Sequence, residues 1–171
     1  MKLLNSPFKL PNGILLQNRI AKSAMSENMG TLNNAPTKNL INAYKVWSQS
    51  EPGLLITGNV MIDSRAIGEP RNVVVEDYSN FELLQEWAKS IKGTKTHIWP
   101  QLNHPGRQAF SAINKKIVGP SSVSLKMGGA SAMFKTPNPL TENEIWDIIK
   151  RFGITAKIMK EAGFTGCQIH G

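Results

Sequence analysis

The C-terminal segment 162–171, AGFTGCQIHG, reads as the end of a helix, a glycine turn, a short apolar strand and a histidine at the strand's C-terminal tip. In proteins built from parallel strands and helices, functional side chains gather at the C-terminal ends of the strands. His170 is therefore the first candidate site residue. Cys167 is the one cysteine of the chain. Its place inside an apolar strand predicts a small, buried side chain.

Three earlier apolar runs also have the length of a strand, so we expect strands at 19–25, 53–61, 96–102 and 166–170. The stretches between these runs place apolar residues at helical spacing. This alternation predicts an α/β fold with a parallel sheet, because parallel neighbours need crossover connections. Before the first unit, two short apolar runs flank Pro11–Gly13 and predict a β-hairpin.

Two helix starts carry the spacing of a capping box, at Ser79 with Glu82 and at Thr141 with Glu144. The last helix should end at Gly163. Its expected apolar face consists of Ile145, Ile148, Ile149, Phe152, Ala156 and Met159. Segment 103–139 is rich in Gly, Pro and Ser and too long for a plain connector. It is either a functional loop beyond the third strand or a disordered insertion.

Composition excludes several classes of protein. The net charge of +8 would suit a nucleic-acid binder, but the Lys and Arg residues are scattered and form no basic stripe, so we expect no nucleic-acid partner. A single cysteine excludes a disulfide framework within one chain, and the histidines lack metal-ligand spacing. No apolar run approaches the roughly 18 residues of a membrane span. The beginning lacks the pattern of a secretory signal, so we expect a cytoplasmic protein without membrane contact.

Small, amide and imidazole side chains dominate the expected strand ends. They are Ser23, Met25, Ser26, Gly58, Asn59, Gln101, Asn103, His104 and His170. Such a set suits a flat heterocycle, since Gly58 lacks a Cβ and Gln101 can donate to and accept from a pyrimidine-like edge. Each residue also has a structural alternative. Gln101 could cap a loop, and His104, followed by Pro-Gly, could hold that turn. We interpret His97 as structural, because it begins its strand.

Four stretches carry a resemblance to a known family. They are SPFKLPNGILLQNRIAKSAMSENMG (6–30), GLLITGNVMID (53–63), PQLNHPGRQA (100–109) and EAGFTGCQIHG (161–171). With these residues in this order, the chain resembles the Old Yellow Enzyme, or NADH:flavin oxidoreductase, family. The resemblance implies a (β/α)8 TIM barrel with FMN at its C-terminal face. Residues 1–171 would supply its first four β/α units and an N-terminal β-hairpin, which is an incomplete barrel.

The family pattern also implies roles for single residues. The flavin ring would lie against Ser23, Ala24, Met25 and Ser26, with Gly58 close to it and Gln101 bonded to its pyrimidine edge. NADH or NADPH would reduce the flavin, which then passes hydride to an activated alkene. His170 matches the first member of the pair that binds the substrate's oxygen. Asn28 stands where some members have a substrate-contacting tyrosine, so we take it as a substrate-binding candidate.

The family's second substrate-binding residue, its last four β/α units and its flavin-phosphate site have no counterparts here. Two interpretations follow. The chain is part of an FMN-dependent oxidoreductase that needs the C-terminal half, or it is an inactive truncated remnant or a split half that acts only with a complementary chain. In both, the phosphate contacts and about half of the ring's surroundings are missing, so we expect weak FMN binding. The first and fourth strands also lack neighbours, so we expect self-association through open barrel edges.

Overall fold

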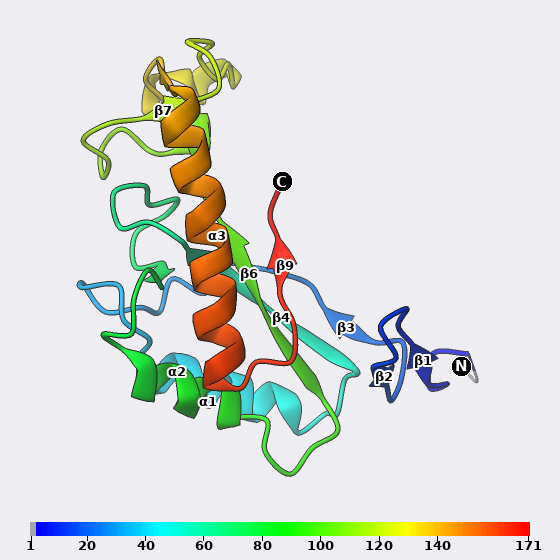
Figure 1. Cartoon of the computed structure of the whole chain (residues 1–171). Helices are drawn as coiled ribbons and strands as arrows, with labels where there is room; N and C mark the ends of the chain where they lie inside the picture. Colours follow the sequence, from blue (N-terminus) through cyan, green and yellow to red (C-terminus); the bar gives the residue numbers. More distant parts are fainter. Residues whose placement is uncertain (1–2) are drawn as a thin grey trace.

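The computed structural model describes residues 3–171, in which a parallel sheet packs against three helices (Figure 1). The strand order in the sheet is β3-β4-β6-β9, with β5 also paired to β4, and every pairing is parallel. The strands are β3 Ala21–Lys22, β4 Leu54–Met61, β5 Val73–Val74, β6 His97–Asn103 and β9 Gln168–Ile169. Neighbours in the main path follow one another along the chain, as in the wall of a β/α barrel.

The helices are α1 Lys38–Ser48, α2 Phe81–Lys89 and α3 Glu142–Ala162. The predicted capping box at Thr141 and Glu144 is present, and Gly163 ends α3 with a φ of 110°, which favours glycine. The predicted box at Ser79 and Glu82 is wrong. The N-cap of α2 is Asn80, whose side chain makes no capping hydrogen bond. The Ser79 N–H instead donates to the carboxylate of Asp77 over 2.8 Å, so the local turn precedes the helix.

The hydrophobic core lies between β4 and β6 on one side and the helices on the other. Trp87 of α2 is fully buried, and its ring centroid lies 5.5 Å from those of Tyr44 in α1 and Phe164. α3 adds Ile158 and Met159, which are also buried. Because the core packs all three helices against β4 and β6, it holds these strands in place and so positions the residues at their C-terminal ends.

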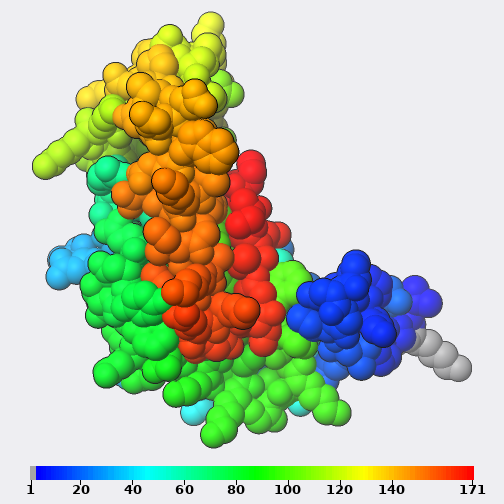
Figure 2. All heavy atoms as spheres, in the orientation of Figure 1, coloured from blue at the N-terminus to red at the C-terminus, as the bar shows by residue number. Residues whose placement is uncertain are grey.

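The outer strands differ from the prediction. Within residues 3–171, β3 pairs only with β4 and β9 only with β6, and both are much shorter than the runs that predicted them. Cys167 is exposed, so its predicted burial is wrong. The reason is that β9 has an uncovered edge, visible beside α3 in Figure 2. The first half of the α3 stripe is exposed as well, with Ile145 at 41% and Ile149 at 51%. The buried residues of the helix lie farther along and are Thr155, Ile158, Met159 and Ala162.

Two peripheral segments lie near opposite ends of the strands. The predicted hairpin is confirmed as β1 Phe8–Lys9 paired antiparallel with β2 Leu15–Leu16. The Gln17 side chain after it donates to the carbonyl of Glu51, just before β4 begins. Segment 103–139 lies beyond the end of β6 (Figure 1). It contains the 3-10 turns η1 Gly106–Gln108 and η2 Gly128–Met133 and the strands β7 Val118–Gly119 and β8 Asn138–Pro139.

No helix among residues 3–171 combines the length and apolar character needed to cross a membrane.

Candidate functional site

A hollow of about 340 Å³ lies at the C-terminal end of the sheet, and we call it the strand-end hollow. Its lining includes Ser26, Asn59, Asn103, His170, Phe110 and Phe134. Asn59 and Asn103 belong to β4 and β6, His170 directly follows β9, Ser26 lies in the segment after β3, and the two phenylalanines come from the segment after β6. The parallel sheet explains this convergence, because the carboxyl ends of parallel strands meet at one edge. Ser26 and His170, predicted from distant parts of the sequence, are therefore brought together.

The backbone of β6 holds the end of β9 in place. The His170 N–H donates to the carbonyl oxygen of Leu102 over 2.9 Å, which extends the ladder one residue beyond β9. One register step earlier, Gln101 is paired with Gln168, and the Gln101 Nε2 donates to the Gln168 Oε1 over 2.7 Å. The exposed His170 side chain thus follows a strand whose position is fixed by two kinds of hydrogen bond. The structure thus places His170 at the strand-end hollow, and its role there stays a prediction.

Asn59 and Ser26 both line the strand-end hollow and contact each other. The Asn59 Nδ2 donates to the Ser26 Oγ over 3.3 Å, which ties the segment after β3 to β4. The Asn59 Oδ1 and the Glu69 Oε2 also belong to residues that line this hollow, and both atoms are buried without a hydrogen-bond partner among residues 3–171. Leaving a buried acceptor unpaired is unfavourable by about 1–3 kcal/mol. Two oxygens of residues that line the hollow therefore lack donors within residues 3–171.

Gly58 has a different neighbour from the one its sequence position suggested. A Cβ on Gly58 would lie 2.4 Å from the Glu27 Oε2 and 2.6 Å from the Met25 carbonyl oxygen. The space that a ring was expected to use is occupied by the chain's own segment after β3. The glycine is thus required for this segment to approach β4, and it acts on the hollow through the placement of Ser26.

The remaining predicted residues, Gln101 among them, do not line the strand-end hollow. Ser23 and Met25 are exposed, Met25 at 66%, and Ala24 is half-buried in the same segment. Asn28 is exposed with a φ of 53° and is not brought to the hollow. Sequence reasoning missed Glu69, because nothing in the pattern around it indicates that it lines the same hollow as Asn59.

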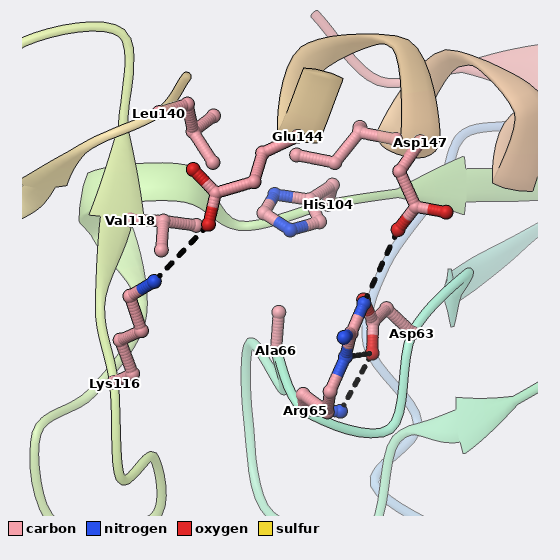
Figure 3. A pocket seen from close by; sticks show the side chains of 10 residues that line it. Asp63, Arg65, Ala66, His104, Lys116, Val118, Leu140, Glu144 and Asp147 are labelled. Carbon is pink, nitrogen blue, oxygen red and sulfur yellow. Dashed lines mark hydrogen bonds and ion pairs between the residues drawn. The ribbon is translucent and has the colours of Figure 1, made fainter. Parts of the chain in front are cut away.

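A second, smaller hollow of about 170 Å³ lies between the end of β4, the loop after β6 and the start of α3 (Figure 3). Its charged groups pair with one another. The Arg65 Nη2 lies 2.7 Å from the Asp63 Oδ2 and 3.4 Å from the Asp147 Oδ2, and Lys116 pairs with Glu144 at 3.2 Å. We interpret this hollow as structural, since its charges already have partners.

His104 lines this second hollow and confirms the structural alternative for that residue. Its Nδ1 accepts a hydrogen bond from the Gly106 N–H over 3.2 Å, which holds the Pro-Gly turn. Burial lowers the pKa of the His104 imidazole, so the neutral form that can accept this bond is favoured. Beside it, burial alone would raise the pKa of Asp63. The hydrogen bonds from Arg65 and the charge of Arg151 outweigh burial and lower the pKa of this carboxyl.

Among residues 3–171, no three His, Cys, Asp or Glu side chains cluster closely enough to hold a metal ion.

Comparison with known proteins identifies the family. Residues 3–171 match the family model described as the NADH:flavin oxidoreductase / NADH oxidase family. The chain is 33% identical to the probable NADH-dependent flavin oxidoreductase YqiG of Bacillus subtilis, with 99% of the chain and 44% of that protein covered. It is 31% identical to the NADH-dependent flavin oxidoreductase iliE of Hypocrea jecorina, with 96% of the chain and 45% of that protein covered.

Solved structures confirm the predicted fold. The old yellow enzyme of Trypanosoma cruzi matches with a TM-score of 0.87 at 22% identity, covering 99% of this chain and 51% of its own. The old yellow enzyme homologue of Zymomonas mobilis matches with a TM-score of 0.83 at 22% identity, covering 98% of this chain and 48% of its own. The fold is therefore the incomplete β/α barrel that the sequence predicted. The chain spans about half the length of these relatives, and it belongs to the NADH:flavin oxidoreductase / NADH oxidase family.

Proposed function

We propose that residues 1–171 are the N-terminal half of an FMN-binding barrel domain in an oxidoreductase that uses NADH or NADPH. The proposal rests on the strand-end hollow of this chain, which belongs to the NADH:flavin oxidoreductase / NADH oxidase family. There, Ser26, Asn59 and His170 converge beside two buried oxygens that lack donors. A flavin ring offers both donors and acceptors along its pyrimidine edge, so the polar groups of this edge of the sheet suit it.

FMN supplies the hydride chemistry when bound, and the protein supplies orientation and hydrogen bonds. The segment Ser23–Ser26 forms one side of the ring's site. It is held against β4 by the close approach at Gly58 and by the bond between Asn59 and Ser26. Gln101 is half-buried in β6 and offers its amide to the ring's polar edge. The Gln101 Oε1 is the acceptor of that amide, since the Nε2 donates to Gln168.

His170 binds the oxygen of the acceptor substrate, for which we propose an activated alkene bearing a carbonyl or nitro group. An imidazole N–H that donates to this oxygen stabilises the negative charge that develops as hydride arrives at the β-carbon. Phe110 and Phe134 line the same hollow, with ring centroids 5.3 Å apart, and they reduce access of water. Exclusion of water strengthens each hydrogen bond to the developing charge.

The proposed activity requires the other half of the barrel. Within residues 3–171, β3 and β9 each have one neighbour, and Ile169 beside the open edge is 57% exposed. Such edges pair readily with further strands. We therefore expect the chain to associate with a complementary half or, in its absence, with itself. A cytoplasmic location and the absence of nucleic-acid and membrane partners stay predictions from the sequence.

Co-expression with the C-terminal half of the Bacillus subtilis relative tests the proposal. The purified pair should contain FMN, oxidise NADH or NADPH, and reduce an activated alkene such as an enone. Substitution of His170 by Ala should lower turnover of the enone while FMN stays bound. A stable pair that takes up no FMN would count against the proposal and would favour the inactive remnant. Alkene reduction that is unchanged in the His170 variant would remove the role of His170.

A further inference from the structure

The segment that carries Ser26 is anchored by a buried carboxylate, Glu27, for which neither the family resemblance nor the strand-end pattern gives a role. The Glu27 side chain is 10% exposed, and three different elements meet at it. The hydroxyl of Tyr44 in α1 and the N–H of Gly58 in β4 both donate to the Glu27 Oε1, the latter over 2.9 Å. The ammonium of Lys22 in β3 lies 3.9 Å from the same oxygen.

An irregularity in β4 explains why the Gly58 N–H is available to Glu27. The register between β4 and β6 shifts between Ile56 and Asn59. At this point the Gln101 N–H donates to the Thr57 Oγ1 over 3.1 Å, whereas a regular ladder would use a backbone carbonyl. Such irregularities redirect backbone groups next to functional sites. Here the redirected N–H meets the carboxylate of Glu27, so the interrupted ladder is completed by a side chain.

The neighbours of Glu27 leave room for its carboxylate and balance its charge. A Cβ on residue 58 would lie 2.4 Å from the Glu27 Oε2, so a glycine is needed where Glu27 enters. Lys22, whose side chain is 18% exposed, donates to the carbonyl oxygens of Ser23 and Ile56 at 3.1 Å each. Its ammonium also lies 4.9 Å from the ring centroid of Trp47. The charge of Glu27 is therefore balanced by a cation of β3 that also binds a carbonyl oxygen of β4.

We infer that Glu27 is a positioning residue for the flavin site: it clamps the segment Ser23–Ser26 to β4 and α1 and thereby sets the place of Ser26. This inference rests on the proposed function. Glu27 acts through its neighbours, since it does not line the strand-end hollow, whereas Ser26 and the adjacent Asn59 do. Loss of the clamp should free the Gly58 amide and loosen the segment against which the ring is proposed to lie.

Two double substitutions of the full chain distinguish loss of the clamp from a general loss of stability. Both also replace Lys22, whose ammonium would otherwise be left without the Glu27 carboxylate. E27A/K22M leaves the Gly58 N–H and the Tyr44 hydroxyl without an acceptor. E27Q/K22M restores an uncharged acceptor of the same length. A matched control, E86A/K38M, removes the exposed ion pair between α1 and α2.

Two measurements on each chain decide the inference. In hydrogen exchange without flavin, the Gly58 amide of E27A/K22M should exchange about tenfold faster or more than in the wild type, while the amides of α3 stay unchanged. In FMN titrations of each chain paired with the complementary C-terminal half, E27A/K22M should bind FMN about tenfold more weakly and alter the visible absorption maximum of the bound FMN. E27Q/K22M should recover most of both properties, and E86A/K38M should match the wild type.

Unchanged Gly58 exchange together with unchanged FMN binding in E27A/K22M would overturn the inference, as would equal losses in the two Glu27 variants. If the wild-type chain paired with the complementary C-terminal half binds no FMN, the proposed function loses its support, while the exchange comparison still decides whether Glu27 clamps the segment.

Discussion

The substitution of Gly58 by Ala tests the close approach on which the geometry of the site depends. The new Cβ would lie 2.4 Å from the Glu27 Oε2, 2.6 Å from the Met25 carbonyl oxygen and 2.8 Å from the Ser26 Cα. Two of these three atoms belong to the backbone and cannot rotate away. Overpacking of this kind destabilises by about 1–3 kcal/mol. The reduced freedom of the unfolded chain offsets about 0.4–1 kcal/mol of this destabilisation. The middle of each range, about 2 and about 0.7 kcal/mol, leaves an expected net loss of about 1.3 kcal/mol.

Urea unfolding followed by circular dichroism measures this loss. With a slope of about 1–3 kcal/mol per molar urea, the midpoint should fall by roughly 0.5–1 M. The matched control is Gly153 to Ala in α3, where an added Cβ meets no atom within 4 Å. There the better helix propensity of alanine should raise the free energy of unfolding by about 0.5–1 kcal/mol. A Gly58 variant as stable as the wild type, or two variants that shift in the same direction, would refute the reasoning.

Three further predictions concern other parts of the chain. Substitution of Thr141 by Ala removes the capping box of α3 and should lower the free energy of unfolding by about 1 kcal/mol. Substitution of Ser79 by Ala should leave the free energy of unfolding nearly unchanged, because Ser79 does not cap α2. Equal effects of the two substitutions in urea unfolding would contradict the observed helix starts. The pKa of Asp63 is lowered in the folded state, so the Asp63 carboxylate stabilises the fold at pH values above its ordinary pKa of about 3.9. This stabilisation is lost as the pH falls below that value. The stability of D63N should therefore decline less steeply in acid than the stability of the wild type. Cys167 is exposed and should react with a thiol reagent in the native chain, faster as the pH rises toward the raised pKa of its thiol; reaction only after unfolding would contradict its position.

The elements that are surrounded by other elements were predictable from the sequence. Neighbouring elements cover β4, β6 and α1, so the residues that must be buried form an apolar run in the two strands and a helical period in α1. The sequence pattern and the structure therefore agree for these elements. β3 and β9 were predicted too long, because the length of an outer strand depends on neighbours that a local pattern does not describe. Cys167 was misjudged for the same reason: an apolar run shows which residues can be buried, not whether anything covers them.

The candidate site was predictable in position but not in detail. His170 and Ser26 follow strands, and the parallel arrangement alone brings such residues together. The role of Gly58 depends on a register shift between β4 and β6 and on a carboxylate 31 residues earlier in the chain. Neither is visible as local periodicity. A glycine inside a buried strand did indicate a close approach, but the sequence alone could not tell a ligand from the chain's own backbone.

An FMN titration of the reconstituted pair tests the central claim most directly, that the strand ends of this chain form one side of a flavin site. The measurement compares the quenching of FMN fluorescence by the wild-type pair with that of variants carrying Gln101 to Leu in β6 or Gln85 to Leu in the outer helix α2. The account predicts binding that is about tenfold weaker for the Gln101 variant and unchanged for the Gln85 variant. Equal affinities in all three pairs, or no binding by any of them, would contradict it.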